Sequence, residues 1–545
     1  MSKVAHYLQE HVSGEVVTSA DARRYFSTDS SIFTVTPAVI LYPRSENDVR
    51  KAARFSWQLA ERGRVIPVTA RGAGTDQSGA AIGEGIILAF TAHLNRIVEF
   101  NAKTGVVTVE PGINYGKLQQ TLQTHGRFLP PYPASLEFST IGGAVANNAS
   151  GEKSFKYGDT RHYVRSLRIV LANGEVIETG RLNKRELSKK LGQSNFEGEI
   201  YRSVDTLVDE HKELFENLQL AVSKNSAGYN IWDVKRPDGS FDLTPLMVGS
   251  QSTLGIVTEI VLDTAIYNPE THLIAAEFDD VKSAHQAITE LKAMKDRPSA
   301  IEMVDRNLLE AVKAINPNLL KGLVKEPYPA IVLLVELDSN NDRTQDRTSR
   351  RAVKIIDKYA RSHQLETTPL KQENLWKIRQ ASAALMAHGE GESKALPIIE
   401  DGIVPLEKFE EYLTKVYDLF ARHNLPIAVW GHAGDANLHI QPQLDLSQVG
   451  NRQIIFRLIE EYYDLVLGLG GSTTAGHGDG RLRAPYLHKM FGDELYGIFH
   501  KVKQIFDPYG TLNPKVKIDV SLNDIKPLIR SSYSLGHLYD HLPRS

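Results

Sequence analysis

Residues 139–151 read STIGGAVANNASG, a run in which almost every side chain is small. Such a run offers a surface on which a flat, extended ligand can lie, or else it forms a tightly packed internal turn. Two other tracts are rich in small residues, RGAGTDQSGAAIG at 71–83 and GSQSTLGIV at 249–257. Because all three occur in one strand-rich region, a single shared ligand is favoured over three unrelated turns.

The tract at 71–83 directly follows a predicted strand over residues 65–69. Glycines at such a point let backbone N–H groups approach an anion closely, as in pyrophosphate binding. No Gly-Lys-Ser/Thr follows, so the tract is not a Walker loop. The next predicted element is a strand and not a helix, which excludes the Rossmann fingerprint.

The segments around these tracts predict a mixed sheet. Residues 38–42 and 65–69 are predicted strands, and the amphipathic stretch 45–63 between them predicts a helix, which together make a strand–helix–strand unit. Residues 161–178 predict a hairpin in which Asn173-Gly174 supplies the positive φ angles of a two-residue turn. We expect little helix between 71 and 180, and a return to the sheet over 246–262.

After about residue 264 the pattern starts again as an α+β arrangement. Strands and helices alternate over residues 272–337, and helices are expected at 342–364, 372–388 and 447–469. Two strands are expected around PIAVWGH and NLHIQPQL, before and after residue 432. Residues beyond 520 are predicted to form a tail. The predicted fold class is α+β.

The composition narrows the range of functions. A chain of 545 residues predicts two or three domains, and a net charge of −3 argues against nucleic acid as a partner. The absence of cysteine excludes disulfides, cysteine-ligated zinc, a thiol nucleophile and the usual iron–sulfur clusters. No stretch approaches the ~20 apolar residues of a membrane span. We therefore expect a cytoplasmic protein, with peripheral association with a membrane left open.

Three further motifs carry polar groups suited to catalysis. GHAGDANLH contains His432 and His439, which can converge on one ion, although the spacing alone favours two unrelated histidines. His477 stands between glycines in AGHGDG, a setting poorly suited to core packing. Arg379 and Lys394 are two of 63 basic residues, most of which are solvated. An arginine can nevertheless bind a carboxylate bidentately.

Taken in order, these motifs resemble the vanillyl-alcohol oxidase/p-cresol methylhydroxylase (PCMH) superfamily, and specifically its FAD-linked D-2-hydroxyacid dehydrogenases. The resemblance runs from about residue 26 to residue 517 and includes FDPYGTLNP at 506–514. It implies a two-subdomain PCMH-type FAD-binding domain at 1–264 and a substrate (cap) domain at 265–470. A C-terminal segment at 471–520 would return to the flavin, and 521–545 would be the tail.

The resemblance implies FAD as the cofactor. The family has Gly-Ser-Glu-Gly-Thr where this chain has GSQST, which preserves the hydrogen-bonding backbone. No histidine lies in the pyrophosphate loop, so the flavin is expected to be non-covalent. The residues that the family pattern assigns to the cofactor are Arg71, Gly72, Ala73, Gly74, Thr75, Ser78, Gly79, Pro133, Ala134, Ser135, Thr140, Gly142, Gly143, Asn147, Ala149, Gly151, Gly255, Ile256, Val257 and Asn513.

The resemblance also assigns roles at the catalytic centre. His477 is the expected base, Arg379 the expected carboxylate anchor, and Lys394 and Asn437 are expected at the substrate. His432 and His439 would bind a divalent metal, either Zn, Mn or Fe. The third ligand of the family, a glutamate, is replaced here by Gly476, so that Asp435 or Glu400 substitutes, the affinity is weaker, or the site holds no metal.

The implied function is oxidation of a D-2-hydroxyacid, D-lactate or D-2-hydroxyglutarate, by hydride transfer to flavin. Because the chain has no cysteine, electrons would pass to a separate iron–sulfur subunit, quinone or cytochrome. Two alternatives stay open: a flavoprotein subunit that no longer oxidises substrate, and an oxygen-using oxidase of a sugar or aromatic alcohol. The oligomeric state is also open, a homodimer included.

Overall fold

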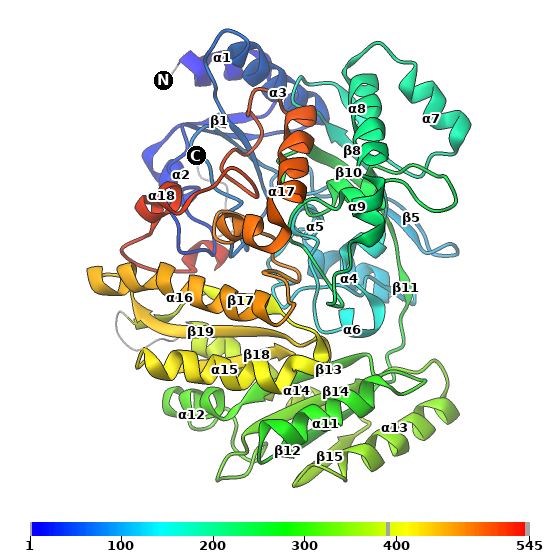
Figure 1. Ribbon diagram of the computed structural model, residues 1–545, viewed down its shortest axis with the longest axis vertical. Coiled ribbons are helices and arrows are strands. Elements are labelled where there is room, and N and C mark those ends of the chain that lie inside the picture. The colour runs from blue at the N-terminus through cyan, green and yellow to red at the C-terminus, as the bar shows by residue number, and fades with distance from the viewer. Residues whose placement is uncertain (1–2, 388–392, 540–545) are drawn as a thin grey trace.

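The computed structural model describes residues 3–387 and 393–539 (Figure 1). Its first sheet has the order β1-β2-β4-β3. β2 and β3 both pair in parallel with β4, so α3 (Glu46–Ala60) makes the crossover that parallel strands need. The predicted strand–helix–strand unit is confirmed. The strands are β1 (Glu15–Val17), β2 (Val39–Tyr42), β3 (Val68–Arg71) and β4 (Ile86–Ala89).

A second, antiparallel sheet has the order β5-β6-β10-β8-β9. The strand latest in the sequence, β10 (Ile256–Asp263), lies between β6 and β8, and every second residue along it is buried. This alternation lets one face pack on the hydrophobic core beneath. The other strands are β5 (Ile97–Asn101), β6 (Val106–Val109), β8 (Val164–Val170) and β9 (Val176–Glu178).

The hairpin between β8 and β9 is present, but the predicted two-residue turn is wrong. Val170 pairs with Val176, so residues 171–175 form the connection. Gly174 has a left-handed φ of 84°, whereas Asn173 is not among the described residues with positive φ. The side chain of Asn173 instead accepts a hydrogen bond from the N–H of Glu175 at 2.9 Å, which stabilises a wider turn.

Part of the small-residue run at 139–151 is helical. It contains the short helix α5 (Ile141–Asn147), whose first turn is capped by the Thr140 hydroxyl on the N–H of Gly143. The helix ends at Asn147, and the next residue, Asn148, caps it with a left-handed φ of 52°. The expectation of little helix before residue 180 is corrected by this helix and by α4 (Tyr115–Gln123) and α6 (Ser154–Tyr157).

The second half of the chain is built on an eight-stranded sheet, whose strand order is β15-β12-β14-β13-β18-β19-β16, with β17 also paired to β19. Figure 1 shows it below the first two sheets, with helices on its faces. The strands are β12 (His272–Phe278), β13 (Ala300–Asp305), β14 (Ile331–Leu337), β15 (Ser362–Glu366), β16 (Ser393–Ala395), β17 (Ile399–Ile403), β18 (Ile427–His432) and β19 (Asn437–Asp445).

Alternation along these strands divides the core into two layers. On β14, Ile331, Leu333 and Val335 belong to one apolar cluster, and Val332 and Leu334 to the other. The first cluster is covered by α11 (Val281–Lys292), α13 (Asp342–Ile356), α15 (Phe409–Arg422) and α16 (Val449–Gly468), and the second by α12 (Arg306–Ile315) and α14 (Pro369–Ala387).

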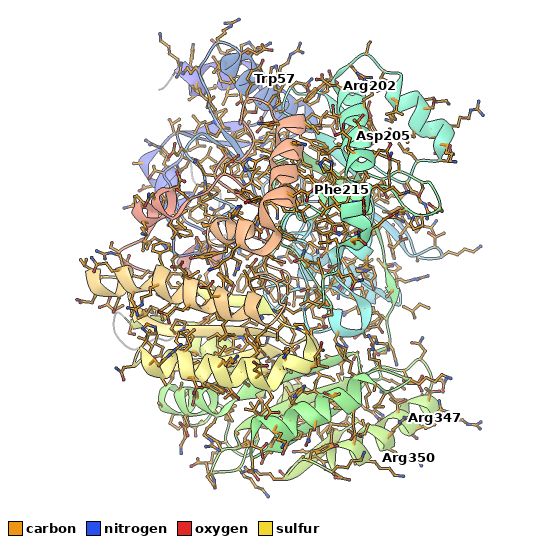
Figure 2. The ribbon with its side chains drawn as sticks, in the orientation of Figure 1. Trp57, Arg202, Asp205, Phe215, Arg347 and Arg350 are labelled. Atoms are coloured by element: carbon orange, nitrogen blue, oxygen red, sulfur yellow. The ribbon has the colours of Figure 1, made fainter. Side chains whose placement is uncertain are left out.

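The helix predicted over 342–364 is too long. The observed helix is α13. Arg347 and Arg350 are exposed on its outer face and point away from the protein (Figure 2). The helix ends at Ile356, and the polar stretch that follows forms β15 at the sheet edge, where Leu273 pairs with Glu366. An exposed edge strand does not need the apolar alternation that marks an inner one, so the pattern missed it.

A C-terminal segment, residues 511–513, returns to the first sheet. The N–H of Val68 donates to the Thr511 carbonyl at 2.8 Å, and the N–H of Asn513 donates to the Val68 carbonyl at 2.9 Å. The remaining helices of four or more residues are α1 (Lys3–His11), α2 (Ala20–Tyr25), α7 (Lys184–Leu191), α8 (Phe196–Glu210), α9 (Lys212–Asn217), α10 (Thr244–Met247), α17 (Leu487–Phe506), α18 (Leu522–Ile525) and the 3₁₀ turn Gly536–Tyr539.

The predicted domain division after residue 264 stays a prediction. Directly after that residue, β11 (Ala265–Ile266) pairs with β7 (Arg127–Phe128), which belongs to the first half of the chain. Within residues 3–387 and 393–539, no helix combines the length and the apolar character that crossing a bilayer requires. The cytoplasmic location likewise stays a prediction.

Candidate active site

One large cavity, of about 1160 Å³, collects residues from both halves of the chain. From the first half it is lined by residues 72–75 and 133–135, and from the second by Arg379, His432, His439 and His477, among others. The motifs that the sequence singled out separately therefore meet around a single space. Its size exceeds that of most small-molecule sites, which suits a dinucleotide together with a substrate.

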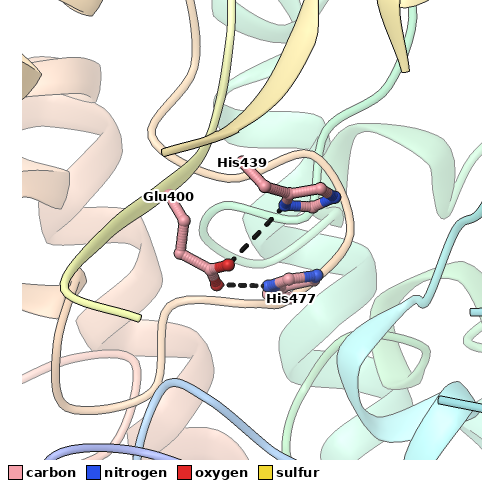
Figure 3. Close-up of side chains that lie close together, drawn as sticks. All are labelled: Glu400, His439 and His477. Atoms are coloured by element: carbon pink, nitrogen blue, oxygen red, sulfur yellow. Dashed lines mark hydrogen bonds and ion pairs between the residues drawn. The ribbon is translucent and has the colours of Figure 1, made fainter. Parts of the chain in front are cut away.

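A buried carboxylate orients His477. Glu400 on β17 is 1% exposed, and its Oε1 lies 2.5 Å from Nδ1 of His477 (Figure 3). Arg483 donates to the same oxygen at 3.1 Å. The amide of Gln77 reaches both oxygens of Glu400, at 2.8 and 2.9 Å. Because Nδ1 of His477 is committed to Glu400, its Nε2 is the nitrogen left for a ligand in the cavity.

The neighbouring carboxylate, Asp401, holds the backbone of the same loop. Its Oδ2 accepts from the Thr474 hydroxyl at 2.5 Å and from the N–H groups of Ala475, Gly476 and His477 at 3.0, 2.9 and 2.8 Å. The N–H of Ala475 also donates to the Asp401 carbonyl at 3.0 Å, but within the described residues the other three donors have no second acceptor, and burying them unpaired is costly. Asp401 therefore fixes the loop, and Glu400 fixes the imidazole.

The charges in this cluster shift the pKa of His477 upward. Burial by itself lowers the pKa of the imidazole, but Asp401 and Glu400 outweigh it and raise the pKa to about 9. Burial likewise raises the pKa of Glu400, yet His477, His439 and Arg483 bring it well below its usual range. His477 is thus a cation at neutral pH and Glu400 an anion.

A second buried carboxylate, Glu302 on β13, connects two predicted site residues. Its Oε2 accepts from Nε of Arg379 at 2.8 Å, and its Oε1 lies 2.6 Å from Nδ1 of His432. Burial raises the pKa of Glu302, but His432 and Arg379 lower it to about 2. Burial lowers the pKa of His432 to about 4, against the attraction of Glu302, so this histidine is neutral.

The possible cation ligands differ from the predicted set. Within the described residues, one group of three metal-type side chains converges, and it consists of Glu400, His439 and His477. His439 Nδ1 lies 3.6 Å from Glu400 Oε2 and has no hydrogen-bond partner although it is buried. His432 is outside the group, with its ring 5.3 Å from that of His439.

Residue 476 has no room for the glutamate that the family pattern places there. A Cβ atom added to Gly476 would collide with the side chain of Ser150. The carboxylate in this cluster comes from Glu400 instead. The cluster of Glu400, His439 and His477 offers imidazole nitrogens and a carboxylate, which are ligand types that zinc accepts. The residues present therefore fit a divalent cation.

The cavity also fits the predicted pyrophosphate loop. Among the described residues, no acceptor is found for the backbone N–H groups of Gly72, Ala73, Gly74 and Thr75, although these residues line the cavity. Unpaired N–H groups facing a cavity suit a bound anion. The predicted cofactor residues in the lining are Gly72, Ala73, Gly74, Thr75, Pro133, Ala134, Ser135, Thr140, Gly143, Asn147 and Ala149.

In the described part of the chain, the other predicted cofactor residues lie outside this lining: Arg71, Ser78, Gly79, Gly142, Gly151, Gly255, Ile256, Val257 and Asn513. Several of them support the loops around it. Arg71 donates to the Thr28 carbonyl at 2.7 Å, and Asn513 donates to the carbonyls of Ala80 and Gln251, each at 2.9 Å. Their contact with a cofactor stays a prediction.

The predicted substrate residues are placed differently. Arg379 and Lys394 line the cavity. Asn437 lies outside the lining, is 1% exposed, and donates to Asp401 Oδ1 and to the Gly402 carbonyl, each at 3.2 Å. Asn437 therefore braces the strand that carries the two carboxylates.

Sequence reasoning missed the roles of Glu302, Asp401 and Arg483. Glu302 is the single charged residue inside the apolar strand segment AIEMV, and a lone acid in an apolar strand is a signal that could have been used. The adjacent acids Glu400 and Asp401 gave a similar signal. Arg483 gave none, because its pairing depends on a contact across 83 positions of sequence.

Two families of known proteins match this chain. Residues 37–180 match the family described as FAD binding domain, and residues 268–516 match the C-terminal domain of FAD linked oxidases. Together the two matches span most of the chain. The chain belongs to the FAD-linked oxidases. FAD is accordingly its cofactor. That its pyrophosphate binds at residues 72–75 stays a prediction.

Individual relatives are similar over nearly the whole chain. The D-2-hydroxyglutarate dehydrogenase of Escherichia coli (strain K12) is 30% identical over 519 residues, covering 93% of this chain and 50% of the relative. The chain thus spans about half the length of that enzyme. Glycolate oxidase subunit GlcD of Bacillus subtilis (strain 168) is 28% identical, covering 92% of each. The D-lactate dehydrogenase of Archaeoglobus fulgidus is 27% identical, covering 92% of this chain and 96% of the relative.

Solved structures share the fold at low identity. p-Cresol methylhydroxylase with substrate bound superposes with a TM-score of 0.68 at 14% identity, covering 96% of this chain and 97% of that chain. Alkyldihydroxyacetonephosphate synthase gives a TM-score of 0.61 at 15% identity, covering 94% and 84%. The predicted PCMH-type α+β fold is confirmed.

We expect Asp401→Ala to destabilise the protein by about 3 kcal/mol or more, because it leaves the N–H groups of Gly476 and His477 and the Thr474 hydroxyl without an acceptor. Thermal or urea unfolding of the purified chain measures this loss. Asp464→Ala is the control, because Asp464 forms a half-exposed surface ion pair with Lys489, and such pairs contribute about 0–1 kcal/mol. Equal stability of the two variants would contradict the role given to Asp401.

Proposed function

We propose that the chain oxidises a D-2-hydroxyacid, of the D-lactate or D-2-hydroxyglutarate type, to the 2-oxoacid. The observation that carries the proposal is that Arg379 and His477 line the same cavity as the pyrophosphate loop. A carboxylate anchor and a base beside a flavin are the groups that this oxidation needs. The names of the relatives support the substrate class.

Arg379 is the proposed anchor for the substrate carboxylate. Glu302 holds its Nε, so the planar guanidinium is fixed before substrate arrives. A carboxylate can then receive two parallel hydrogen bonds from a fixed fork. Lys394, on β16 in the same lining, adds a second positive charge for the substrate. Asn437 is proposed to act through Asp401 and not by touching substrate.

His477 is the proposed base. Its Nε2 takes the proton from the C2 hydroxyl, and the hydrogen on C2 leaves with its electron pair. Glu400 stabilises the imidazolium that forms and keeps the ring in one orientation, as the acid does in a catalytic triad. FAD, when bound, supplies the acceptor for that hydride.

Anaerobic mixing with D-lactate and with D-2-hydroxyglutarate tests the proposal. We expect at least one of them to bleach the flavin absorbance of the wild-type chain. His477→Ala should slow bleaching by about 100-fold or more while FAD stays bound, because the base is lost. His488→Ala is the matched control, since this histidine is exposed and lies outside the cavity lining. Unchanged bleaching in His477→Ala would refute the assignment.

The pH dependence tests the same base. Because the pKa of His477 is about 9, the base form is scarce at neutral pH. In chelator-treated protein, kcat/KM should therefore rise about tenfold per pH unit below 9 and level off above it. Glu400→Gln removes one of the raising charges and should move the inflection to lower pH. A profile already flat between pH 6 and 9 would contradict this.

We further propose that Glu400, His439 and His477 form the site for a divalent cation such as zinc. Binding there would use the imidazole lone pair of His477, so His477 could not act as the base while the ion is bound. The ion would instead lower the pKa of a hydroxyl in the cavity.

Metal titration with zinc, followed by calorimetry and elemental analysis, tests the ligand set. We expect about one ion per chain in the wild type, a loss of binding in His439→Ala and Glu400→Ala, and retention in His432→Ala. The last expectation follows because His432 lies outside the group of side chains that converge. A loss in His432→Ala equal to that in His439→Ala would favour the family-type pair, and no binding to the wild type would reject the site.

Electrons are proposed to leave for a separate acceptor, an iron–sulfur subunit, a quinone or a cytochrome, because the sequence holds no cysteine for a relay. A second candidate function is that of a flavoprotein subunit in a larger complex. It is favoured by the similarity to a relative that is itself named a subunit, over 92% of both chains. Flavin bleaching by substrate separates the two, because a subunit that does not oxidise substrate leaves the flavin oxidised.

A further inference from the structure

The segment 528–539 lies beyond both family matches, the later of which ends at residue 516, yet it lines the cavity. It is joined to the residues around Phe33 by backbone hydrogen bonds: the N–H of Thr34 donates to Leu528 at 2.8 Å, and the N–H of Arg530 donates to Ile32 at 2.9 Å. Its cavity-lining residues are Tyr533, Ser534, Leu535, Gly536, Leu538 and Tyr539.

His537 contacts the pyrophosphate loop directly. Its Nε2 lies 2.9 Å from the carbonyl oxygen of Gly74, and its own carbonyl accepts from the Tyr25 hydroxyl at 3.1 Å. Burial and the nearby Arg71 lower the pKa of His537 to about 4, so the imidazole is neutral at physiological pH. A carbonyl can only accept, so Nε2 carries the hydrogen.

Tyr533 reaches the same peptide by a second route. Its hydroxyl donates to the Ser30 carbonyl at 2.9 Å, and the N–H and hydroxyl of Ser30 donate to the Gly74 carbonyl at 3.0 and 3.1 Å. The guanidinium of Arg530 lies over the Tyr533 ring, 4.8 Å from its centroid, and donates to the carbonyls of Asp29 and Ser31.

The Gly74 carbonyl therefore accepts three hydrogen bonds from the protein: from the N–H of Ser30, from the Ser30 hydroxyl and from Nε2 of His537. A peptide whose carbonyl is held in this way cannot rotate to present its oxygen to the cavity. The oxygen would repel a pyrophosphate, whereas the unpaired N–H groups of the loop attract it.

We infer that residues 528–539 form an outer wall of the FAD site, in which His537 and Tyr533 are positioning residues that hold the Gly74 peptide in its anion-binding orientation. The inference rests on FAD binding, which the family assigns, and not on the proposed oxidation of a hydroxyacid. FAD affinity measured without substrate therefore tests it separately: a chain that binds FAD but oxidises no hydroxyacid leaves it standing.

Flavin fluorescence titration of the FAD-free, full-length chain measures the effect. We expect His537→Ala to raise the Kd for FAD about fivefold, which corresponds to one lost neutral hydrogen bond. Tyr533→Phe should raise it by a smaller factor, and the double variant by about 20-fold. His537→Gln should restore most of the affinity, because its side-chain amide can donate to the same carbonyl.

The unfolding temperature of each FAD-free variant separates positioning from folding. The inference predicts that the temperature of His537→Ala stays close to that of the wild type while the Kd changes. His488→Ala, an exposed histidine outside the lining, should change neither. A double variant whose Kd stays within twofold of the wild type would overturn the inference. So would a variant that binds weakly only in proportion to lost stability and is not rescued by glutamine.

Discussion

Two adjacent carboxylates on one buried strand, Glu400 and Asp401 on β17, hold the candidate catalytic centre together. Asp401 fixes the backbone of the loop before His477, and Glu400 fixes the imidazole of His477 itself. Buried charges are costly unless they are paired, and here Arg483 and the imidazolium supply the opposite charge. The position of the proposed base therefore depends on a charge balance that includes all of these groups.

The rest of the fold brings other groups to this pair. The eight-stranded sheet carries Glu302, which orients Arg379 and His432. Both of these side chains line the cavity that His477 also lines. The first half of the chain contributes the loop with unpaired N–H groups, and segment 528–539 covers that loop. Where the family pattern has a glutamate, Ser150 fills the space beside Gly476, which lies in a loop, and the carboxylate comes from Glu400 on β17.

The sequence predicted what is local and missed what depends on distant contacts. Parts of the small-residue tracts and of the histidine motifs line one cavity, and each was found because it is a short pattern with its own physical reason. Glu302 was missed because its partner His432 lies 130 positions away. The two-residue turn at Asn173 was wrong because an Asn side chain can stabilise a wider turn. β15 was missed because an exposed edge strand can be mostly polar. His537 reaches Gly74 across 463 positions, and nothing in its own segment indicated this contact.

The most direct test of this account is the pKa of His477, measured by NMR on FAD-loaded, metal-free protein labelled with ¹⁵N-histidine and assigned with His477→Gln. The account predicts a pKa of about 9, with the proton on Nδ1 retained at neutral pH, and a clear fall in Glu400→Gln. A pKa near the ordinary value of about 6.5, unchanged in Glu400→Gln, would contradict it.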